Sequence, residues 1–469
     1  MFNPADEDFL RPLRQDLPAR VFKEITEDYL LEPRGKFRGQ GVLLSPENTE
    51  QVAAIITAAA AHRVPVIPYG GGTGLVGGQV SEDLQQPIIL SLERMNKIRA
   101  TYPAENTMIA EAGAILADVQ TAAAQQDRLF PLSLASQGSA RIGGNLSSNA
   151  GGVNVLRYGN ARDLTLGIEA VMPNGQIFNG LTRLRKDNTG YDLRHLLIGA
   201  EGTLGVITAA TLKLFPRPSD RATALLVVPD PAAALALYAL AGDILGQGIS
   251  AFELLNETGL NFLSEKMPHV RQPFNVPPKW SVLVDVGLFR DNAASEGIEA
   301  LFGAGQDAGL VIDGVVAQSD AQVEQIWNVR ESIPAANRLV GAIASHDISL
   351  PLGAIAEFVA SAPDKLAALG QFRINCFGHL GDGNLHYNVY PPKGANRDDY
   401  HSVAPKVTRL IHDLVADYGG SFSAEHGIGR LKVAELERYG DPVKLSAMRA
   451  IKAALDPKGI MNPGVMLRG

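Results

Sequence analysis

The sequence contains almost no cysteine. Cys376 is the only one among 469 residues, so a disulfide within the chain is impossible. One thiol is also too few for an iron–sulfur cluster or a thiolate zinc site. We interpret Cys376 as a small buried residue rather than a nucleophile.

The sequence also lacks an excess of positive charge and any long apolar run. The formal net charge of −8 argues against nucleic-acid binding, which needs a basic surface. No apolar run approaches the ~20 residues that span a bilayer. The first ten residues, MFNPADEDFL, show neither the apolar stretch of a signal peptide nor a transit-peptide pattern. We therefore expect a cytoplasmic protein without a membrane span.

Length and composition are those of a soluble protein of two to three domains, with 46% hydrophobic and 20% charged residues. The prolines in TLKLFPRPSD mark a boundary near residue 216. We predict a first domain over residues 1–216 with a helical lead-in over residues 1–36. A middle domain over residues 217–415 and a C-terminal segment over residues 416–469 follow.

Strands alternate with helices in the middle domain. ATALLVVP, ISAFELLN, WSVLVDVGLF, VIDGVVAQ and ASHDISLP are typical of strands, and DPAAALALYALAGDIL is typical of a helix opened by Asp-Pro. This pattern predicts an α+β fold, a sheet covered by helices. In the first domain we expect a helix with Ser45 as N-cap and Pro46 in its first turn, followed by a strand at VPVIP. Residues 404–417 and the segment DPVKLSAMRAIKAAL are predicted helices.

The chain has 48 glycines, and some of them form clusters in loops. GGGTGLVGG matches the dinucleotide fingerprint formally, but a Rossmann loop must open a helix, and here a loop and a strand follow. A second glycine cluster, SQGSARIGGNLSSNAGGVNVLRYGN, covers residues 136–160, and a third, EGTLGVIT, covers residues 201–208. Glycine lets backbone N–H groups approach a ligand and form anion-binding nests. Three such loops together predict a pyrophosphate site with room for a flat ring.

These loops also carry a family resemblance. PVIPYGGGTGLVGG, GSARIGGNLSSNAGG, RKDNTGYDLRHLLIGAEGTLGVIT and DPKGIMNPG resemble the FAD domain of the vanillyl-alcohol oxidase flavoprotein superfamily. Within it the chain is similar to D-2-hydroxyglutarate and D-lactate dehydrogenases. The resemblance implies an FAD-binding domain of two small α/β lobes, to which the C-terminal segment returns. It also implies a substrate domain with an antiparallel sheet.

The resemblance further implies the residues that hold FAD. Some relatives bind flavin covalently through a His in the first loop, where this chain has Thr73, so we expect non-covalent FAD. The cofactor-binding residues implied are Pro68, Gly70, Gly71, Gly72, Thr73, Gly74, Leu75, Pro131, Ser136, Gly138, Ser139, Ile142, Gly143, Gly144, Asn149, Gly151, Gly152, Tyr158, Gly159, Glu201, Gly202, Gly205, Val206, Ile207 and Asn462.

The segment INCFGHLGDGNLHYNVY predicts a β-hairpin that turns at Asp382-Gly383. His379 and His386 are equidistant from the centre of that turn. In a simple hairpin they face each other with Cβ atoms about 5 Å apart, which suits two imidazoles on one divalent ion. Two unrelated hairpin histidines are the alternative.

A carboxylate for the same ion lies in SAEHGIG, where Glu425 precedes His426. A His₂Glu set leaves coordination positions open, which is typical of catalytic sites. Because neighbouring side chains diverge, we interpret His426 as a base rather than a ligand. The resemblance implies the same roles, and a substrate-binding role for Asn388. We expect zinc, with manganese or iron as alternatives.

These residues predict the oxidation of a 2-hydroxy acid. We expect that a metal would bind the hydroxyl and carboxylate oxygens, that His426 would accept the hydroxyl proton, and that flavin N5 would receive the hydride. Arg330, in WNVRESIP, is the expected bidentate partner of the substrate carboxylate.

The identity of the acid is less fixed by the sequence. D-2-hydroxyglutarate is the first expectation, and D-lactate, D-malate or glycolate are alternatives. Where the hydroxyglutarate enzymes of the family have a Thr and a Lys, this chain has Pro334 and Ser345. Arg338 or Arg373 are possible substitutes for a distal carboxylate site.

Two other functions fit parts of the pattern. A His₂Glu centre with a nearby base also suits a metal hydrolase, but the three glycine loops would then have no role. A non-catalytic flavoprotein is the other alternative. Nothing in the sequence indicates a nicotinamide site, so we expect an electron-transfer flavoprotein or a quinone as electron acceptor. A homodimer is the default expectation.

Overall fold

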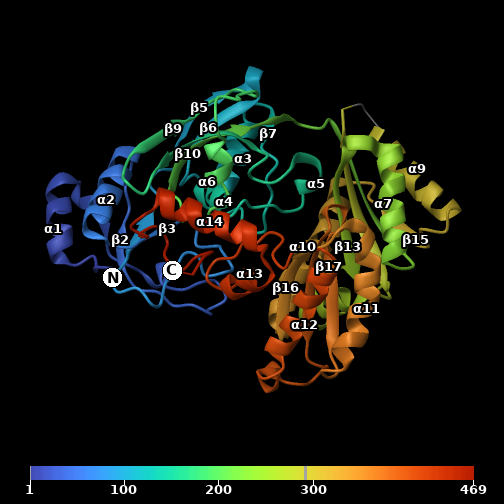
Figure 1. Ribbon diagram of the computed structural model, residues 1–469. Helices are drawn as coiled ribbons and strands as arrows, with labels where there is room; N and C mark the ends of the chain where they lie inside the picture. Colours follow the sequence, from blue (N-terminus) through green and yellow to red (C-terminus); the bar gives the residue numbers. More distant parts are fainter. Residues whose placement is uncertain (1, 290–292, 469) are drawn as a thin grey trace. The chain divides into compact units, whose positions relative to one another are not determined.

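The computed structural model describes residues 2–289 and 293–468, which form two compact units (Figure 1). The first unit comprises the chain up to Gly151, Gly159–Arg217, and the chain from Glu425 onward. The second comprises Gly152–Tyr158 and Pro218–Ala424. The borders thus fall after residues 217 and 424, where the sequence had suggested 216 and 415. Residues 416–424 stay with the second unit because their backbone pairs there, as at the bridge between Ser349 and Ser421.

The first unit mixes short strands and helices. Its elements are α1 (Glu7–Asp16), η1 (Ala19–Val21), β1 (Phe22–Lys23), η2 (Glu27–Tyr29), β2 (Val42–Leu44), α2 (Thr49–His62), β3 (Val66–Tyr69), β4 (Ile88–Ser91), β5 (Ile98–Tyr102), η3 (Pro103–Glu105), β6 (Thr107–Glu111), α3 (Leu116–Ala124), β7 (Arg128–Leu129), α4 (Ile142–Ser147), β8 (Thr165–Val171), β9 (Ile177–Gly180), α6 (Leu193–Leu197), β10 (Val206–Lys213), β11 (Phe215–Pro216), α13 (Val433–Tyr439) and α14 (Pro442–Leu455). The lead-in is helical only from Glu7 to Asp16, and short turns and a two-residue strand follow.

Two sheets organise the first unit. The smaller has the order β1-β2-β4-β3, with parallel pairing of β4 to both β2 and β3. The larger is antiparallel, with the order β5-β6-β10-β8-β9. α2 contributes Ile55 and Ile56 to a buried core that also includes Ile88 of β4. Full burial of each such side chain stabilises the fold by about 1.5–3 kcal/mol. This is the two-lobed architecture expected of the FAD-binding domain.

The start of α2 differs from the prediction. Asn48, not Ser45, is the N-cap, and its side chain accepts a hydrogen bond from the Gln51 N–H at 2.9 Å. The prediction of Ser45 was wrong because its own N–H donates to the Val21 carbonyl at 2.7 Å, which keeps the chain extended for longer.

The C-terminal segment returns to the smaller sheet. The Val66 N–H donates to the Ile460 carbonyl at 2.9 Å, and the Asn462 N–H donates to the Val66 carbonyl at 2.8 Å. Met461 thereby forms a parallel bridge to Val66 at the free side of β3. Residues about 400 apart in sequence thus form one edge of the first unit.

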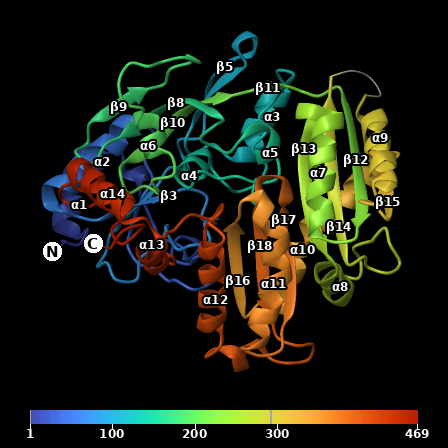
Figure 2. The same ribbon diagram turned by 45° about the vertical axis from the view of Figure 1, so that its right-hand side comes forward.

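The second unit contains a seven-stranded antiparallel sheet with the order β15-β12-β14-β13-β17-β18-β16 (Figure 2). Its elements are α5 (Val155–Tyr158), β12 (Asp220–Val228), α7 (Pro231–Leu245), η4 (Gly246–Gly248), β13 (Ile249–Asn256), α8 (Glu257–Lys266), β14 (Trp280–Leu288), α9 (Ala293–Asp307), β15 (Asp313–Val316), α10 (Asp320–Val340), β16 (Ala344–Ser349), η5 (Leu352–Ala354), α11 (Ile355–Ala367), β17 (Arg373–His379), η6 (Leu380–Asp382), β18 (Asn384–Tyr390), η7 (Arg397–Tyr400) and α12 (Ala404–Asp417). The predicted α+β class is confirmed.

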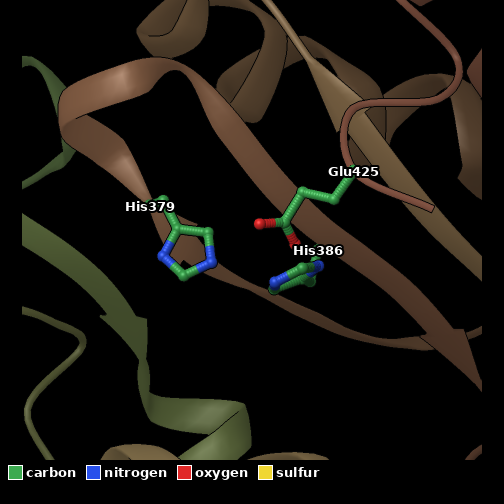
Figure 3. A group of neighbouring side chains, drawn as sticks. All are labelled: His379, His386 and Glu425. Atoms are coloured by element: carbon green, nitrogen blue, oxygen red, sulfur yellow. The ribbon is translucent and has the colours of Figure 1, made fainter. Parts of the chain in front are cut away.

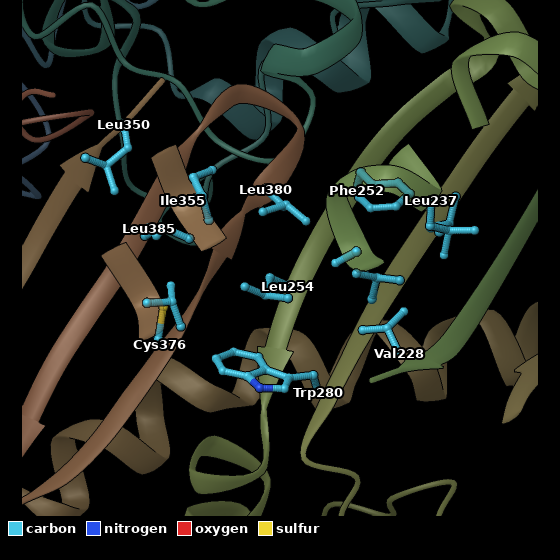
Figure 4. Close-up of a cluster of buried hydrophobic side chains, with 14 of the residues drawn as sticks. Val228, Leu237, Phe252, Leu254, Trp280, Leu350, Ile355, Cys376, Leu380 and Leu385 are labelled. Carbon is cyan, nitrogen blue, oxygen red and sulfur yellow. The ribbon is translucent and has the colours of Figure 1, made fainter. Parts of the chain in front are cut away.

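Helices cover both faces of this sheet. On one face, α7, α9, α11 and α12 pack on alternate strand residues such as Phe252, Leu254 and Cys376 (Figure 4). The interpretation of Cys376 as a small buried residue is confirmed: burial raises the pKa of its thiol to about 12. On the other face, α8 and α10 pack on the intervening residues, among them Leu255 and Phe377. Because strand residues alternate between faces, Glu253 and His379 lie on the α10 face.

Among the described residues, no helix combines the length and the apolar character needed to cross a membrane.

Candidate active site

The hairpin that carries the two histidines has a different register from the predicted one. Phe377, not His379, is the cross-strand partner of His386. The prediction that the histidines face each other directly was wrong, because a four-residue connection over residues 380–383 replaces a two-residue turn. It consists of the 3₁₀ turn Leu380–Asp382 and Gly383, whose φ is +82°. The histidines are instead diagonal neighbours on one face, with ring centroids 5.6 Å apart.

Glu253 of β13 is the direct cross-strand partner of His379. Its Oε1 lies 2.6 Å from Nδ1 of His379, and the Glu253 side chain is only 1% exposed. Burial by itself would raise the pKa of Glu253, but the charges and hydrogen bonds of His379 and Arg330 outweigh it and lower that pKa to about 2. Glu253 is therefore an ionised carboxylate within the sheet.

His386 also has a carboxylate as its cross-strand partner. Asp347 of β16 lies opposite His386, with its Oδ1 3.8 Å from the ring Nδ1. The same oxygen accepts a hydrogen bond from the Asn384 side-chain amide at 2.9 Å. Each of the two histidines is thus paired with an acidic residue on a neighbouring strand.

Glu425 directly follows a residue that is hydrogen-bonded to β16, the strand next to this hairpin. The N–H of Ala424, the last residue of the second unit, donates to the Asp347 carbonyl at 3.2 Å. The Glu425 carboxylate points toward the two imidazole rings (Figure 3). One potential ligand atom from each of His379, His386 and Glu425 lies within 4.8 Å of the others.

This group fits a divalent metal ion in its chemistry. Two imidazole nitrogens and one carboxylate oxygen are a set that binds zinc with open coordination positions. An ion about 2 Å from each ligand brings ligand atoms to about 3.3 Å from one another, which small side-chain rotations supply. The three predicted ligands are therefore brought together.

His426 does not diverge from Glu425 as expected. Its ligand atom lies within 4.8 Å of those of Asp347 and Glu425. The expectation was wrong because neighbouring side chains diverge along an extended strand, whereas residues 424–426 lie in a bend. Position therefore allows His426 to act either as a base or as a further ligand.

Arg330 lies on α10, over the same sheet face, and is only 6% exposed. Its Nε donates to Glu253 Oε2 at 2.7 Å, and its guanidinium carbon lies 5.1 Å from the centroid of the Phe377 ring. Asn388 is buried in β18, two residues after His386 and hence on the same face.

The positions considered for a distal carboxylate differ in exposure and in their partners. Pro334 is half-buried within α10, whereas Ser345 and Arg338 are exposed. Arg373 donates to Glu265 Oε2 at 3.1 Å and to the Pro391 carbonyl at 2.9 Å. Arg373 is therefore engaged elsewhere.

The first two predicted flavin loops are in close contact within the first unit. A Cβ atom at Gly71 would lie 2.2 Å from the Ser139 carbonyl oxygen, and one at Gly70 would lie 3.1 Å from the Gly144 Cα. Only glycine permits this approach. The side-chain Nδ2 of Asn145, in the second loop, is buried without a hydrogen-bond partner among the described residues. A buried donor of this kind fits a ligand that supplies an acceptor.

The third loop is joined to the C-terminal segment. The Asn462 side-chain amide donates to the carbonyls of Gly78 and Glu201 at 2.9 and 2.8 Å. A Cβ atom at Gly202 would lie 2.9 Å from the Pro68 ring. Most of the predicted cofactor-binding residues thus belong to the first unit. Gly152 and Tyr158 do not, because they begin and end the short segment that belongs to the second unit.

Glu253 and Asp347 were missed by the sequence reasoning. Each is an acidic residue within a strand that is otherwise largely buried, in ISAFELLN and ASHDIS. A charged residue in a buried strand usually has a specific partner, which is the signal that could have identified both.

Comparisons with known proteins identify the family and the fold of the chain. The profile described as FAD binding domain matches residues 41–180, and that of FAD linked oxidases, C-terminal domain, matches residues 217–466. The chain is 36% identical to the mitochondrial D-2-hydroxyglutarate dehydrogenase of Arabidopsis thaliana, over 91% of this chain and 75% of that protein. It is 36% identical to the D-2-hydroxyglutarate dehydrogenase of Xanthomonas citri pv. viticola, over 89% and 87%. The substrate-bound structure of p-cresol methylhydroxylase shares the fold, with a TM-score of 0.77, 15% identity and coverage of 97% and 96%.

Proposed function

The chain belongs to the FAD-linked oxidases, and we propose that it oxidises a D-2-hydroxy acid, D-2-hydroxyglutarate or a close analogue, to the 2-oxo acid. Two relatives named D-2-hydroxyglutarate dehydrogenase support this substrate class. The observation that carries the proposal is the His₂Glu group on the sheet face over which the buried Arg330 lies. A substrate with a hydroxyl and a carboxylate on adjacent carbons needs both the His₂Glu group and the arginine.

The proposal includes a divalent metal, zinc in the first instance and manganese or iron as alternatives. His379, His386 and Glu425 would hold it. When bound, the ion supplies a Lewis acid for the substrate hydroxyl, and non-covalent FAD supplies the hydride acceptor.

The chain's own residues supply orientation and proton transfer. Arg330 holds the substrate carboxylate, since the guanidinium can present its terminal nitrogens while Nε binds Glu253. Asn388 binds the substrate by hydrogen bonding from β18. His426 accepts the hydroxyl proton, which typically contributes 10²–10⁴-fold to the rate.

A shorter acid is the second candidate, and the distal positions favour it. Pro334 has no donor and Ser345 carries no charge. Of the two candidate substitutes, Arg338 is exposed on α10 and Arg373 is already paired with Glu265. D-lactate and glycolate have no distal carboxylate, and the second carboxylate of D-malate lies one carbon nearer than that of 2-hydroxyglutarate.

The other parts of the proposal concern partners and location. We propose an electron-transfer flavoprotein or a quinone as electron acceptor, a homodimer, and a cytoplasmic location. Turnover with either acceptor but not with NAD would agree with the proposed electron acceptor. A dimer mass in light scattering would agree with the proposed homodimer. Cell fractionation tests the third.

The decisive experiment is anaerobic bleaching of the flavin absorption near ~450 nm by a panel of D- and L-2-hydroxy acids. We expect bleaching by D-acids with release of the 2-oxo acid, and comparison of D-2-hydroxyglutarate with D-lactate and D-malate ranks the substrates. A colourless protein that cannot be reconstituted with FAD would contradict the flavin assignment. A flavoprotein that no D-2-hydroxy acid bleaches would contradict the substrate class.

A further inference from the structure

One carboxylate joins two functional side chains from different elements. Glu253 Oε1 lies 2.6 Å from His379 Nδ1 of β17, and Glu253 Oε2 accepts a hydrogen bond from Arg330 Nε of α10 at 2.7 Å. Glu253 itself lies on β13, and all three side chains are at most 8% exposed.

We propose that Glu253 is a positioning residue that sets the metal ligand His379 and the substrate-binding Arg330 in one fixed arrangement. This inference rests on the proposed function, since it assigns His379 to the metal and Arg330 to the substrate. Glu253 itself contacts neither the metal nor the substrate.

The carboxylate determines which nitrogen of His379 faces the ion. Glu253 Oε2 accepts from Arg330, which is always protonated, and Oε1 lies at hydrogen-bond distance from Nδ1 of His379. Because both carboxylate oxygens then act as acceptors, Nδ1 of His379 carries the proton. Nε2 then keeps its lone pair for the metal, and the hydrogen bond fixes the ring and raises its basicity. Loss of such an outer partner typically weakens metal binding by 10–100-fold.

The other oxygen determines the placement of Arg330. The buried guanidinium contacts Phe377, and the Phe377 ring centroid lies 5.0 Å from that of His386. Glu253 therefore joins Arg330 to one metal ligand by hydrogen bonds, and Phe377 joins it to the other by packing. The distance between the ion and the guanidinium is thereby restricted, which suits a substrate that bridges the two.

Glu253→Gln tests the arrangement with almost no change of shape. An amide has one accepting and one donating end, so it cannot accept from both His379 and Arg330. If its oxygen stays with Arg330, its NH₂ faces Nδ1, and the imidazole must place its proton on Nε2, which blocks the metal. If its oxygen stays with His379, Arg330 loses its partner. At least one of the two functions must weaken.

Asp285→Asn is the matched control. Asp285 is equally buried, on the adjacent strand β14, and accepts from Thr223 and from Trp327 of α10. This exchange perturbs the same sheet and the same helix but leaves the contacts of Glu253 intact.

The experiment compares FAD-loaded, full-length proteins in two binding measurements that do not need turnover. Zinc affinity is measured by chelator competition, and acid affinity by the change in flavin absorption on adding the 2-oxo acid product. We expect Glu253→Gln to weaken at least one of these affinities by 10-fold or more, with Asp285→Asn within threefold of wild type in both. Both affinities of Glu253→Gln within threefold of Asp285→Asn would overturn the proposal.

A double variant covers the case in which Glu253→Gln folds poorly. Glu253→Gln with Arg330→Met removes both buried charges, and it lets the Gln oxygen accept from His379 without competition. We expect zinc affinity within threefold of wild type and a loss of acid affinity of at least 10-fold. Loss of zinc affinity in this variant as well would contradict the hydrogen-bond argument.

The wild-type measurements test the proposed function separately. A wild-type protein that binds no divalent metal, or that binds metal but is bleached by no 2-hydroxy acid, refutes the proposed function. The ratio between variant and control tests only Glu253. The two failures are therefore distinguishable.

Discussion

The carboxylate of Glu201 accepts the backbone N–H of Gly429 at 2.7 Å, across 228 positions of the sequence. Its other oxygen accepts the N–H of Ile428 at 2.8 Å. The family resemblance implies that Glu201 is among the FAD-binding residues, and in the structure its side chain holds the turn that follows His426. Burial raises the pKa of Glu201 even though both N–H groups stabilise its ionised form. Two hydrogen bonds therefore join the third glycine loop to the turn after the proposed base.

Replacement of Glu201 by alanine should destabilise this turn. Two backbone N–H groups lose their acceptor, and an unsatisfied buried donor costs about 1–3 kcal/mol. We expect a loss in this range in denaturant unfolding, and a smaller loss for Glu201→Gln, which keeps one accepting oxygen. Equal stability of the alanine variant and wild type would show that water replaces the carboxylate.

Glu169 gives the first unit a pH-dependent contribution. Burial tends to raise the pKa of Glu169, but hydrogen bonds from Arg99, Thr49 and Thr208 outweigh burial and lower it. A carboxyl whose pKa is lowered by folding stabilises the native state above its unfolded-state pKa of about 4.3, and this stabilisation is lost as the pH falls through the folded-state pKa.

Glu169→Gln should therefore be less stable than wild type at pH 7, by about 1.5–3 kcal/mol for hydrogen bonds to a charged group. The difference should shrink as the pH is lowered below about 4, because protonated glutamate resembles glutamine. Unfolding curves between pH 3 and 8 measure it. A difference that does not change with pH would mean that packing, not charge, is what the substitution removes.

Removal of the metal should separate the two cofactors. Dialysis against a strong chelator is expected to abolish flavin bleaching by a 2-hydroxy acid while the protein stays yellow. The reason is that the flavin loops and the His₂Glu group consist of different residues. Addition of zinc, manganese or iron(II) should restore bleaching and identify the preferred ion. Full bleaching by the chelated protein would contradict metal dependence.

His426→Ala distinguishes a base from a ligand. If His426 is the base, the rate of flavin reduction should fall by about 10²–10⁴-fold while the zinc content stays at one ion per chain. If His426 instead binds the ion together with Asp347 and Glu425, the zinc content should fall too. Elemental analysis and stopped-flow reduction of one preparation give both answers, with Glu425→Gln as the reference for a lost ligand.

Two glycines of the predicted flavin site offer a matched pair. A Cβ atom at Gly71 would lie 2.2 Å from the Ser139 carbonyl oxygen, whereas one at Gly138 meets nothing within 4 Å. Gly71→Ala should force the two loops apart, which costs about 1–3 kcal/mol, and should lower the FAD content. Gly138→Ala adds a methyl group to the second loop without a clash between the loops, so it should lose less FAD than Gly71→Ala. Equal FAD content in the two variants would contradict a role for the close approach of the loops.

Many helices and strands of the fold could be predicted from local sequence patterns. The Asp230-Pro231 pair opens α7, as predicted, because the Asp side chain caps the helix and Pro suits its first turn. Residues 404–417 form α12, and each strand predicted in the middle domain is present. Helix and strand periodicity are properties of neighbouring residues, so one sequence suffices to read them. The start of α2 was misjudged because Ser45 is engaged by Val21, a contact that the local pattern does not contain.

The residue types of the site were readable, but their geometry was not. The Asp-Gly turn and their equal distance from it singled out His379 and His386. Their register, with Phe377 opposite His386, depends on how many residues the turn consumes. A change of that number by two moves a cross-strand pair to a diagonal while every side chain keeps its face.

The sequence by itself determined a flavin fold rich in glycine loops, a hairpin that carries two histidines, and Glu425 as a carboxylate to go with them. Only the tertiary structure decided that Glu253 lies opposite His379 and holds Arg330, 77 positions away in sequence. It also decided that Glu201 binds the turn after His426. The physical reason is that backbone propensity and periodicity are local, whereas the partner of a buried charge is chosen by strand order and helix packing across the whole unit.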